Sequence, residues 1–271
     1  SFDTNRDSLK TRKLVASGDL NDMDIIIGPL YTSNFRIVCN RYGNDTSKVL
    51  ISPLSQNTYN VRKYPAVYQV APSFQIQIKI IKDYILEHYK DERVLVLDSR
   101  KVKGKSSYIR NSFSKDEKFV EVVGIGSTHI DSLRPLFEKK QIVIIPSSRK
   151  AFVSKVLGSI GGMDSTSIIF GLQDWKKYDN LDINNLMFLD VHFPDPNVFD
   201  FSDEHDVAFL RLFEQKYNTN QARYSHIAYN IIMNFCSNSK RYKFIKISGG
   251  GRVNSTAPLH HYINYELTPV N

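Results

Sequence analysis

Short apolar runs alternate along the chain with longer segments whose apolar residues recur at helical spacing. The runs are rich in Val, Ile and Leu, and several are continuously apolar, as expected for strands that are covered on both faces. We therefore predict strands at residues 24–28, 49–52, 67–70, 93–98, 119–123, 141–145, 167–170 and 186–191.

The clearest helical pattern covers residues 74–89. Its main apolar residues repeat at spacings of four, three and four, so they form one buried stripe. Ser73 precedes this segment and is a candidate N-cap. Two further helices are predicted, one that begins after Ser202 and one at residues 224–235.

This alternation of strands and helices predicts βα units and mostly parallel sheets. Eight predicted strands are many for one open sheet in a chain of 271 residues, so we expect two smaller sheets. Proline-bearing segments at residues 69–73 and 192–197 are expected to connect two lobes. The predicted fold class is α/β, with parallel sheets flanked by helices.

One motif recurs where predicted strands end. The stretches MDIIIGPLYTSN (residues 23–34), KVLISPLSQN (48–57) and QIVIIPSSRK (141–150) each run from an apolar strand through a proline into hydroxyl-bearing residues. Proline and serine are also ordinary turn and N-cap residues, so a purely structural role remains open for each copy.

The functional interpretation of this motif is a polar ligand site. Ligands of open α/β sheets bind beyond the carboxyl ends of the strands, and helix N-termini there favour carboxylate or phosphate. Thr32, Ser33 and Asn34 would offer hydroxyls and an amide after the first strand, and Ser55 would do so after the second. Ser148 would present a hydroxyl from the opposing lobe.

The same stretches resemble the type I periplasmic binding protein superfamily, which contains the branched-chain amino-acid binding proteins and extracellular ligand-binding receptors. The resemblance rests on DIIIGPLYTSN, VLISPLSQN and YPAVYQVAPSFQIQ, followed in order by IIFGLQDW, FEQKYNTNQARYSHIAYNIIMNF and GGGRVNSTAPLHHYINYEL. Similar domains occur in Bacteroidetes envelope proteins that carry LysM peptidoglycan-binding repeats. A related domain occurs in lipoproteins that activate cell-wall synthases.

The resemblance implies two lobes. Residues 1–70 and 196–248 would form the first, and residues 71–195 and 249–271 the second. Members of the superfamily normally have a further strand and helix before the segment that matches residues 1–24. The first lobe is therefore expected to be N-terminally truncated, with a vacancy beside the strand at residues 24–28 or another chain in that place.

The resemblance also implies first-lobe contacts to a ligand. In amino-acid binders of this fold, hydroxyls and backbone N–H groups at two strand ends hold the α-carboxylate. The matching positions are Thr32, the backbone of Leu54, and Gln56.

The second lobe departs from that pattern. Gln173 stands where an acidic residue normally holds the ligand's ammonium, and a neutral amide lacks the charge-assisted bond. Val102 and Ser148 occupy the approximate positions of the aromatic clamp, and Trp175 is left to cover a ring-shaped or sugar ligand. We therefore expect no tight binding of a free α-amino acid.

Composition and charge bear on the expected partners of the protein and on the state of its cysteines. The formal charge of +8 is spread in scattered Lys and Arg pairs, which favours a solvated basic surface over a nucleic-acid site. No apolar run approaches the roughly 20 residues that span a bilayer, so membrane attachment is expected only through a lipid anchor outside this chain. Cys39 and Cys236 lie in apolar helical patterns and are expected to be buried free thiols, although one disulfide stays open.

Nothing in the sequence favours an enzyme, a cofactor or a metal site. There is no Gly-x-Ser-x-Gly elbow, and His192, His205 and His226 show no ligand spacing. His260 and His261 are adjacent and would point to opposite faces of a strand.

Two functions remain open. The first is a non-enzymatic solute-binding or sensor protein of a Gram-negative periplasm or cell envelope, with a small polar ligand between the lobes. The second is an envelope scaffold or regulator of peptidoglycan synthesis, which would use the same fold to contact peptidoglycan or an envelope protein.

Overall fold

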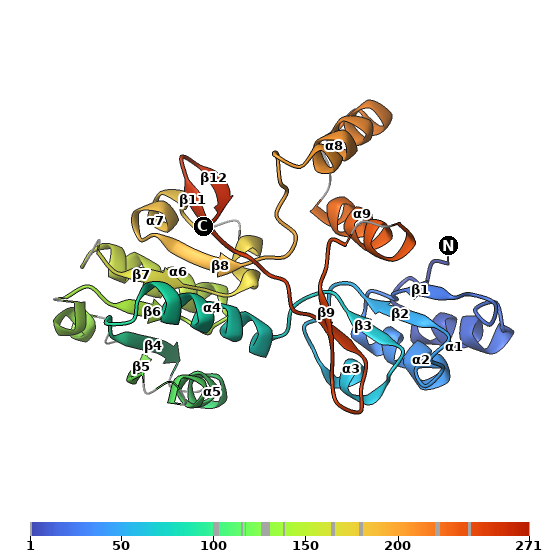
Figure 1. The fold of residues 1–271 in the computed structure, drawn as a ribbon, viewed down its shortest axis with the longest axis horizontal. Coiled ribbons are helices and arrows are strands. Elements are labelled where there is room, and N and C mark those ends of the chain that lie inside the picture. Colours follow the sequence, from blue (N-terminus) through green and yellow to red (C-terminus); the bar gives the residue numbers. More distant parts are fainter. Residues whose placement is uncertain are drawn as a thin grey trace. The chain divides into compact units, whose positions relative to one another are not determined.

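The protein forms two compact units of helices and parallel-dominated sheets (Figure 1). A computed structural model describes residues 2–99, 103–114, 116, 118–125, 131–137, 139–163, 166–178, 181–219, 223–237 and 240–270. Residues 1–73 and 196–256 belong to the first unit, and residues 74–195 and 257–271 to the second.

The first unit is built on a five-stranded sheet in the order β1-β2-β3-β10-β9, parallel except for β9. Helices α1 and α2 pack together, and α9 supplies Ile231 to a core that includes Ile51 and Val70. Its elements are α1 (Ser8–Ser17), β1 (Ile25–Ile27), α2 (Thr32–Tyr42), β2 (Val49–Ser52), α3 (Tyr59–Lys63), β3 (Val67–Gln69), α8 (Glu204–Tyr217), α9 (Arg223–Cys236), β9 (Phe244–Lys246) and β10 (Arg252–Asn254).

Strand β1 lies at the edge of this sheet and pairs only with β2 among the described strands. A groove of about 760 Å³ runs along it, lined by β1, by residues 2–6 and by apolar side chains of α1 and α2. Ile27 and Leu30 are 44% and 57% exposed there. On its other side β1 has no partner strand among the described residues, in line with the expected vacancy.

The second unit is built on a seven-stranded sheet in the order β12-β11-β8-β7-β6-β4-β5, in which β4 to β8 run parallel. Helices α4 and α5 pack together, as do α6 and α7, and Figure 1 shows α4 and α6 over opposite faces of the sheet. Its elements are α4 (Phe74–His88), β4 (Val94–Ser99), α5 (Lys103–Ser114), β5 (Val120–Ile125), the 3₁₀ helix η1 (Asp131–Phe137), β6 (Ile142–Ile144), α6 (Lys150–Gly161), β7 (Ile168–Phe170), η2 (Gln173–Lys177), α7 (Ile183–Phe188), β8 (Val191–Pro194), β11 (Leu259–Ile263) and β12 (Glu266–Pro269).

Three expectations from the sequence are wrong. Of residues 186–191, the first three end α7, the next two form a turn and only Val191 is in a strand, because Asp182 caps a helix there by accepting a hydrogen bond from the backbone N–H of Asn184. Residues 249–256 lie in the first unit, because β10 pairs with β3. Both cysteines are free, but Cys236 is exposed and only Cys39 is buried.

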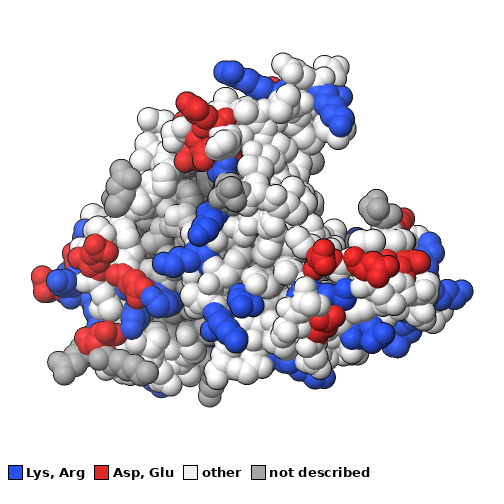
Figure 2. All heavy atoms as spheres, turned by 45° about the vertical axis from the view of Figure 1, so that its right-hand side comes forward, with Lys and Arg blue, Asp and Glu red and all other residues white. Residues whose placement is uncertain are grey.

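The surface carries charges of both signs. Figure 2 shows Lys and Arg side chains in separate groups, interspersed with Asp and Glu, on the face that it draws. Within the described part of the chain, no helix has the length and hydrophobicity needed to cross a bilayer.

Candidate functional site

The carboxyl ends of β1 and β2 form a polar rim on the first unit. The strands are parallel neighbours, so the loops that follow them emerge at the same edge of the sheet. Gly28 ends β1 with a φ of +85°, which favours glycine, and its N–H donates to the Ile51 carbonyl at 2.8 Å. This hydrogen bond holds the first loop against the second strand.

The structure brings two of the predicted site residues together on this rim. The Thr32 hydroxyl, at the start of α2, lies 3.3 Å from the Ser55 hydroxyl in the loop after β2. Ser55 in turn accepts the backbone N–H of Asn57 at 3.2 Å. Leu54 and Gln56 flank it and are half-buried, so they stay near the surface.

Two neighbours of Thr32 differ in exposure. Ser33 is exposed, as expected. Asn34 is only 1% exposed, so the prediction that it offers its amide at the surface is wrong. Neither side-chain atom of Asn34 has a hydrogen-bond partner among the described residues. A buried unpaired amide is costly, and a bound water or ligand commonly satisfies such a group.

The second unit has its own rim, at the carboxyl ends of β7 and β8. The Gln173 side chain donates to Asp195 at 3.3 Å, and its backbone N–H donates to Gln77 at 2.9 Å. Asp195 has a side chain only 3% exposed and forms an ion pair with Lys176 at 2.9 Å. The carboxylate nearest Gln173 is thus already paired with a cation of the protein.

Neither Asp174 nor Trp175 is placed as a ligand contact: each side chain is engaged with another part of the protein. Asp174 forms an ion pair with Lys177 at 2.6 Å, in line with the expectation that its side chain faces elsewhere. Trp175 is 2% exposed, and its indole N–H donates to the Ser147 carbonyl at 2.8 Å. Its ring is therefore part of the core, whereas the sequence analysis left it to cover a ligand.

The remaining predicted residues of the second unit are not drawn together. Ser148 is exposed just before α6, whereas Ser147 is buried and accepts the backbone N–H of Arg149 at 3.2 Å. Val102 lies outside the described residues.

A buried polar residue that was not predicted from the sequence, Asp98, lies near the carboxyl end of β4. Asp98 is 4% exposed, accepts the Ser99 backbone N–H at 2.7 Å, and accepts the Ser106 hydroxyl. Burial lowers the pKa of Lys105 on the adjoining helix α5, and the charges of Asp174 and Asp98 oppose that effect. A carboxylate at the end of a strand that precedes a hydroxyl-rich helix is a signal that sequence reasoning can use.

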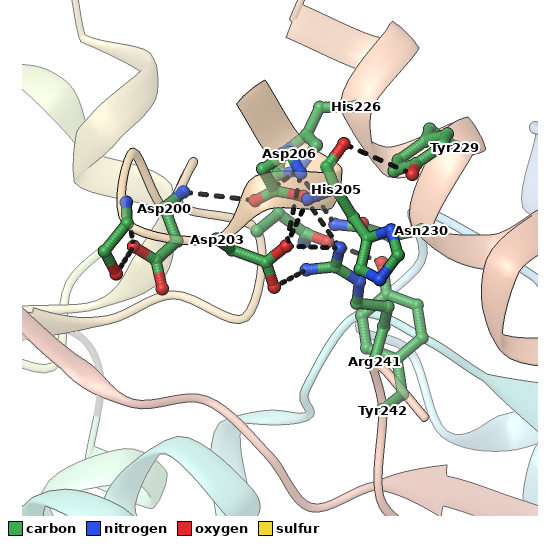
Figure 3. Close-up of polar contacts among 11 residues, drawn as sticks. Asp200, Asp203, His205, Asp206, His226, Tyr229, Asn230, Arg241 and Tyr242 are labelled. Atoms are coloured by element: carbon green, nitrogen blue, oxygen red, sulfur yellow. Dashed lines mark hydrogen bonds and ion pairs between the residues drawn. The ribbon is translucent and has the colours of Figure 1, made fainter. Parts of the chain in front are cut away.

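A second polar cluster lies where α8 begins beside α9 (Figure 3). Asp206 is almost fully buried and contacts His226 at 3.2 Å, Arg241 at 3.1 Å and the backbone N–H of Asp200 at 3.1 Å. Arg241 also pairs with Asp203, the N-cap of α8. These ion pairs tie together α8, α9 and the segment before β9, although Nε of Arg241 has no hydrogen-bond partner among the described residues.

No family model matches this sequence, and no curated protein is similar to it by sequence comparison. Solved structures do match its fold. An ABC transporter substrate-binding protein from Desulfitobacterium hafniense, solved with Leu, has a TM-score of 0.69 at 12% identity, over 99% of this chain and 87% of that one. The branched-chain amino acid substrate-binding protein LivJ from Streptococcus pneumoniae, solved with isoleucine, has a TM-score of 0.55 at 14% identity, over 98% and 84%.

A third match comes from a different functional class. The C-domain of LpoA from Haemophilus influenzae, described as a regulator of PBP1A, has a TM-score of 0.60 at 11% identity, over 100% of this chain and 88% of that one. Together these similarities show that the chain has the two-lobed α/β fold of the type I periplasmic binding proteins.

Proposed function

We propose that this protein is a non-enzymatic solute-binding or sensor protein of the cell envelope, and that a small polar ligand contacts the rim of its first unit. The observation that carries the proposal is the 3.3 Å approach of the Thr32 and Ser55 hydroxyls at the carboxyl ends of two neighbouring parallel strands. Ligands of open α/β sheets bind at such ends.

Two further features support a ligand at this rim. Helix α2 begins at Thr32 with no side-chain cap, so its first backbone N–H groups remain available to an anionic or polar group. The unpaired amide of Asn34 lies in the first turn of the same helix. We assign Thr32, Ser33, the backbone of Leu54, Ser55 and Gln56 as first-unit contacts.

Residues of the second unit indicate which chemical class of ligand is expected. An α-amino acid brings an ammonium group, which needs a free carboxylate nearby. Gln173 is neutral, and Asp195 beside it is paired with Lys176. We therefore propose a polar ligand without a free α-ammonium group, with Gln173 and Ser148 as second-unit contacts.

A second candidate function rests on the similarity to the LpoA C-domain. In that case the protein would be an envelope scaffold or regulator of peptidoglycan synthesis, and its partner would be peptidoglycan or an envelope protein. Both candidates place the protein in a Gram-negative envelope, with any lipid anchor or LysM repeat outside these residues. The sequence of the complete gene tests that placement.

A thermal-shift screen of the whole chain separates the two functions. Sugars, nucleobases, muropeptides and amino acids are each added in large excess. A solute-binding protein gains about 2.7 kcal/mol at a hundredfold excess of ligand over Kd. A rise in melting temperature with one small-molecule class supports the first function. Pull-down of a peptidoglycan synthase with no small-molecule response supports the second.

A further inference from the structure

Two histidines and an aspartate meet in the second unit, at the opposite end of β8 from Asp195. Strands β8 and β11 are antiparallel neighbours, with Leu259 opposite Pro194 and His260 opposite Phe193. One step further along the pair, His192 faces His261, and their ring centroids are 4.8 Å apart. Asp190 precedes β8, so the cluster lies at the amino end of that strand, whereas Asp195 lies at its carboxyl end.

Asp190 is held directly against both rings. Its carboxylate oxygen Oδ1 lies 2.8 Å from Nδ1 of His261 and 3.7 Å from Nδ1 of His192. Its backbone carbonyl lies 2.8 Å from Nδ1 of His192. The backbone of Asp190 is fixed in turn, since it has a φ of +42° and its N–H donates to the Met187 carbonyl at 3.1 Å.

The geometry points to a binding site for a first-row divalent transition cation such as Zn²⁺, with Asp190, His192 and His261 as its protein ligands. One candidate ligand atom from each residue lies within 4.8 Å of the others, and the described residues contain no other such group of three. Zn²⁺ bonds of about 2.0–2.1 Å at tetrahedral angles place ligand atoms about 3.4 Å apart. The two pairs that include Asp190 are 2.8 and 3.7 Å apart and bracket that value, and the histidine nitrogens lie within 4.8 Å of each other.

The donor set selects the class of metal. Imidazole nitrogen suits Zn²⁺, Cu²⁺, Ni²⁺ and Fe²⁺, whereas Mg²⁺ and Ca²⁺ require mostly oxygen ligands. Three protein ligands leave a position for water. Asp190 is 46% exposed in its side chain and His261 18%, which gives the cation a path to the site. When the metal binds a ring through Nδ1, the proton of that nitrogen moves to Nε2 or to solvent.

The surroundings support a defined site. His192 has a side chain only 2% exposed, and its ring packs 5.2 Å from the Phe170 ring and 6.0 Å from the Tyr84 ring. These contacts restrict the orientation of His192, and an apolar shell of this kind limits solvent access to a metal. Sequence spacing gave no sign of the cluster, because 69 positions separate His192 from His261.

The site also has a defined place in the chain path. Strand β8 is the last element before the chain leaves the second unit after Asp195, and β11 follows its return at Ala257. A cation on Asp190, His192 and His261 would cross-link the outgoing and returning strands. Metal binding should therefore stabilise the second unit independently of any ligand on the first.

Calorimetry of the whole, metal-stripped chain with Zn²⁺ tests the proposal. We expect one Zn²⁺ bound per chain, a higher melting temperature with Zn²⁺ but not with Mg²⁺, and visible absorption from bound Co²⁺. Loss of groups that merely support metal ligands typically costs 10–100-fold in affinity, so His261→Gln and Asp190→Asn should each weaken binding by at least about 100-fold. The control is His205→Gln, which should leave Zn²⁺ binding unchanged because His205 is an exposed residue of the first unit.

The variants must first be shown to fold. Melting curves in a chelator that match those of the unmodified chain establish this, and anomalous scattering from a crystal grown with Zn²⁺ locates the ion without any variant. Absence of stoichiometric Zn²⁺ binding would overturn the site. So would an affinity that survives both His261→Gln and Asp190→Asn, or an anomalous peak elsewhere on the chain.

Discussion

Replacement of Asp206 by Ala is the most informative test of how the first unit is held together. Its side chain is 2% exposed and contacts His226, Arg241 and the Asp200 backbone N–H. The substitution leaves His226 and the guanidinium of Arg241 in a buried site without this carboxylate. Removal of one partner of a buried ion pair typically costs 3–5 kcal/mol.

The expected loss lies at the lower end of that range. Arg241 keeps Asp203, which it contacts at 3.0 Å, so its charge is not left wholly unpaired. Asp200 is exposed, so its backbone N–H can donate a hydrogen bond to water instead. We therefore expect Asp206→Ala to lower the free energy of unfolding by about 3 kcal/mol. Asp206→Asn should cost less, because the amide oxygen still accepts a hydrogen bond.

The loss should depend on pH. Burial raises the pKa of Asp206, but hydrogen bonds from His226 and Asp200 and the charges of His226 and Arg241 outweigh it and hold the pKa below its usual value. A lowered folded-state pKa gives stability that is present above the unfolded value, about 3.9, and is lost as pH falls through the folded value. The difference between Asp206→Asn and the unmodified chain should shrink as pH falls below about 4.

Urea denaturation followed by circular dichroism measures these changes. Asp22→Ala, an exposed aspartate of the same unit, should change stability by no more than about 0.5 kcal/mol. A double-mutant cycle with Arg241→Met should give a coupling free energy of at least about 1 kcal/mol. A loss below about 1 kcal/mol for Asp206→Ala, or no coupling to Arg241, would show that Asp206 does not hold these elements together.

Three further outcomes follow from individual residues. Burial raises the pKa of Cys39 to about 12, so a thiol reagent should modify Cys236 quickly and Cys39 only on unfolding, and Cys236→Ser should abolish the fast reaction. Gly171→Ala would place a Cβ 2.5 Å from the Trp175 ring and should destabilise the second unit by about 1–3 kcal/mol in thermal or urea unfolding. Gly158→Ala, its matched control, meets nothing within 4 Å in helix α6 and should stabilise that unit by about 0.5–1 kcal/mol; the opposite sign for either would contradict the packing.

The continuous apolar runs made much of the fold predictable. Strand β2 covers Val49–Ser52 as predicted, and the spacing of Ile78, Ile81 and Ile85 correctly indicates the buried face of α4. The segment at residues 186–191 was wrongly predicted to be a strand, because its apolar residues suit the end of a helix and the start of a strand equally. Strands β9 to β12 were not predicted because they are short, and because β10 and β11 depend on pairing with β3 and β8, which are distant in sequence.

The candidate site was only partly predictable, for a similar reason. The approach of Thr32 to Ser55 follows from two similar strand-end motifs, in each of which a proline after an apolar strand precedes a hydroxyl-bearing residue. The burial of Trp175 and the pairing of Asp195 with Lys176 depend on tertiary packing, which local spacing does not encode. The register that sets His192 against His261 is equally non-local.

The most direct test of the proposed function is calorimetry of the polar rim itself. The compound that stabilises the protein in the thermal-shift screen is titrated into the unmodified chain, into a Thr32→Ala, Ser55→Ala double variant, and into Ser47→Ala. Ser47 has an exposed hydroxyl and precedes β2, so it lies at the amino ends of the strands, away from the rim at their carboxyl ends. The proposed rim site predicts saturable binding that weakens at least about tenfold in the double variant, the loss of about 1.4 kcal/mol expected for hydrogen bonds to a ligand. It also predicts unchanged binding to Ser47→Ala and no binding of free leucine, valine or glutamate. Micromolar binding of a free amino acid, or a ligand whose affinity ignores both Thr32 and Ser55, would contradict it.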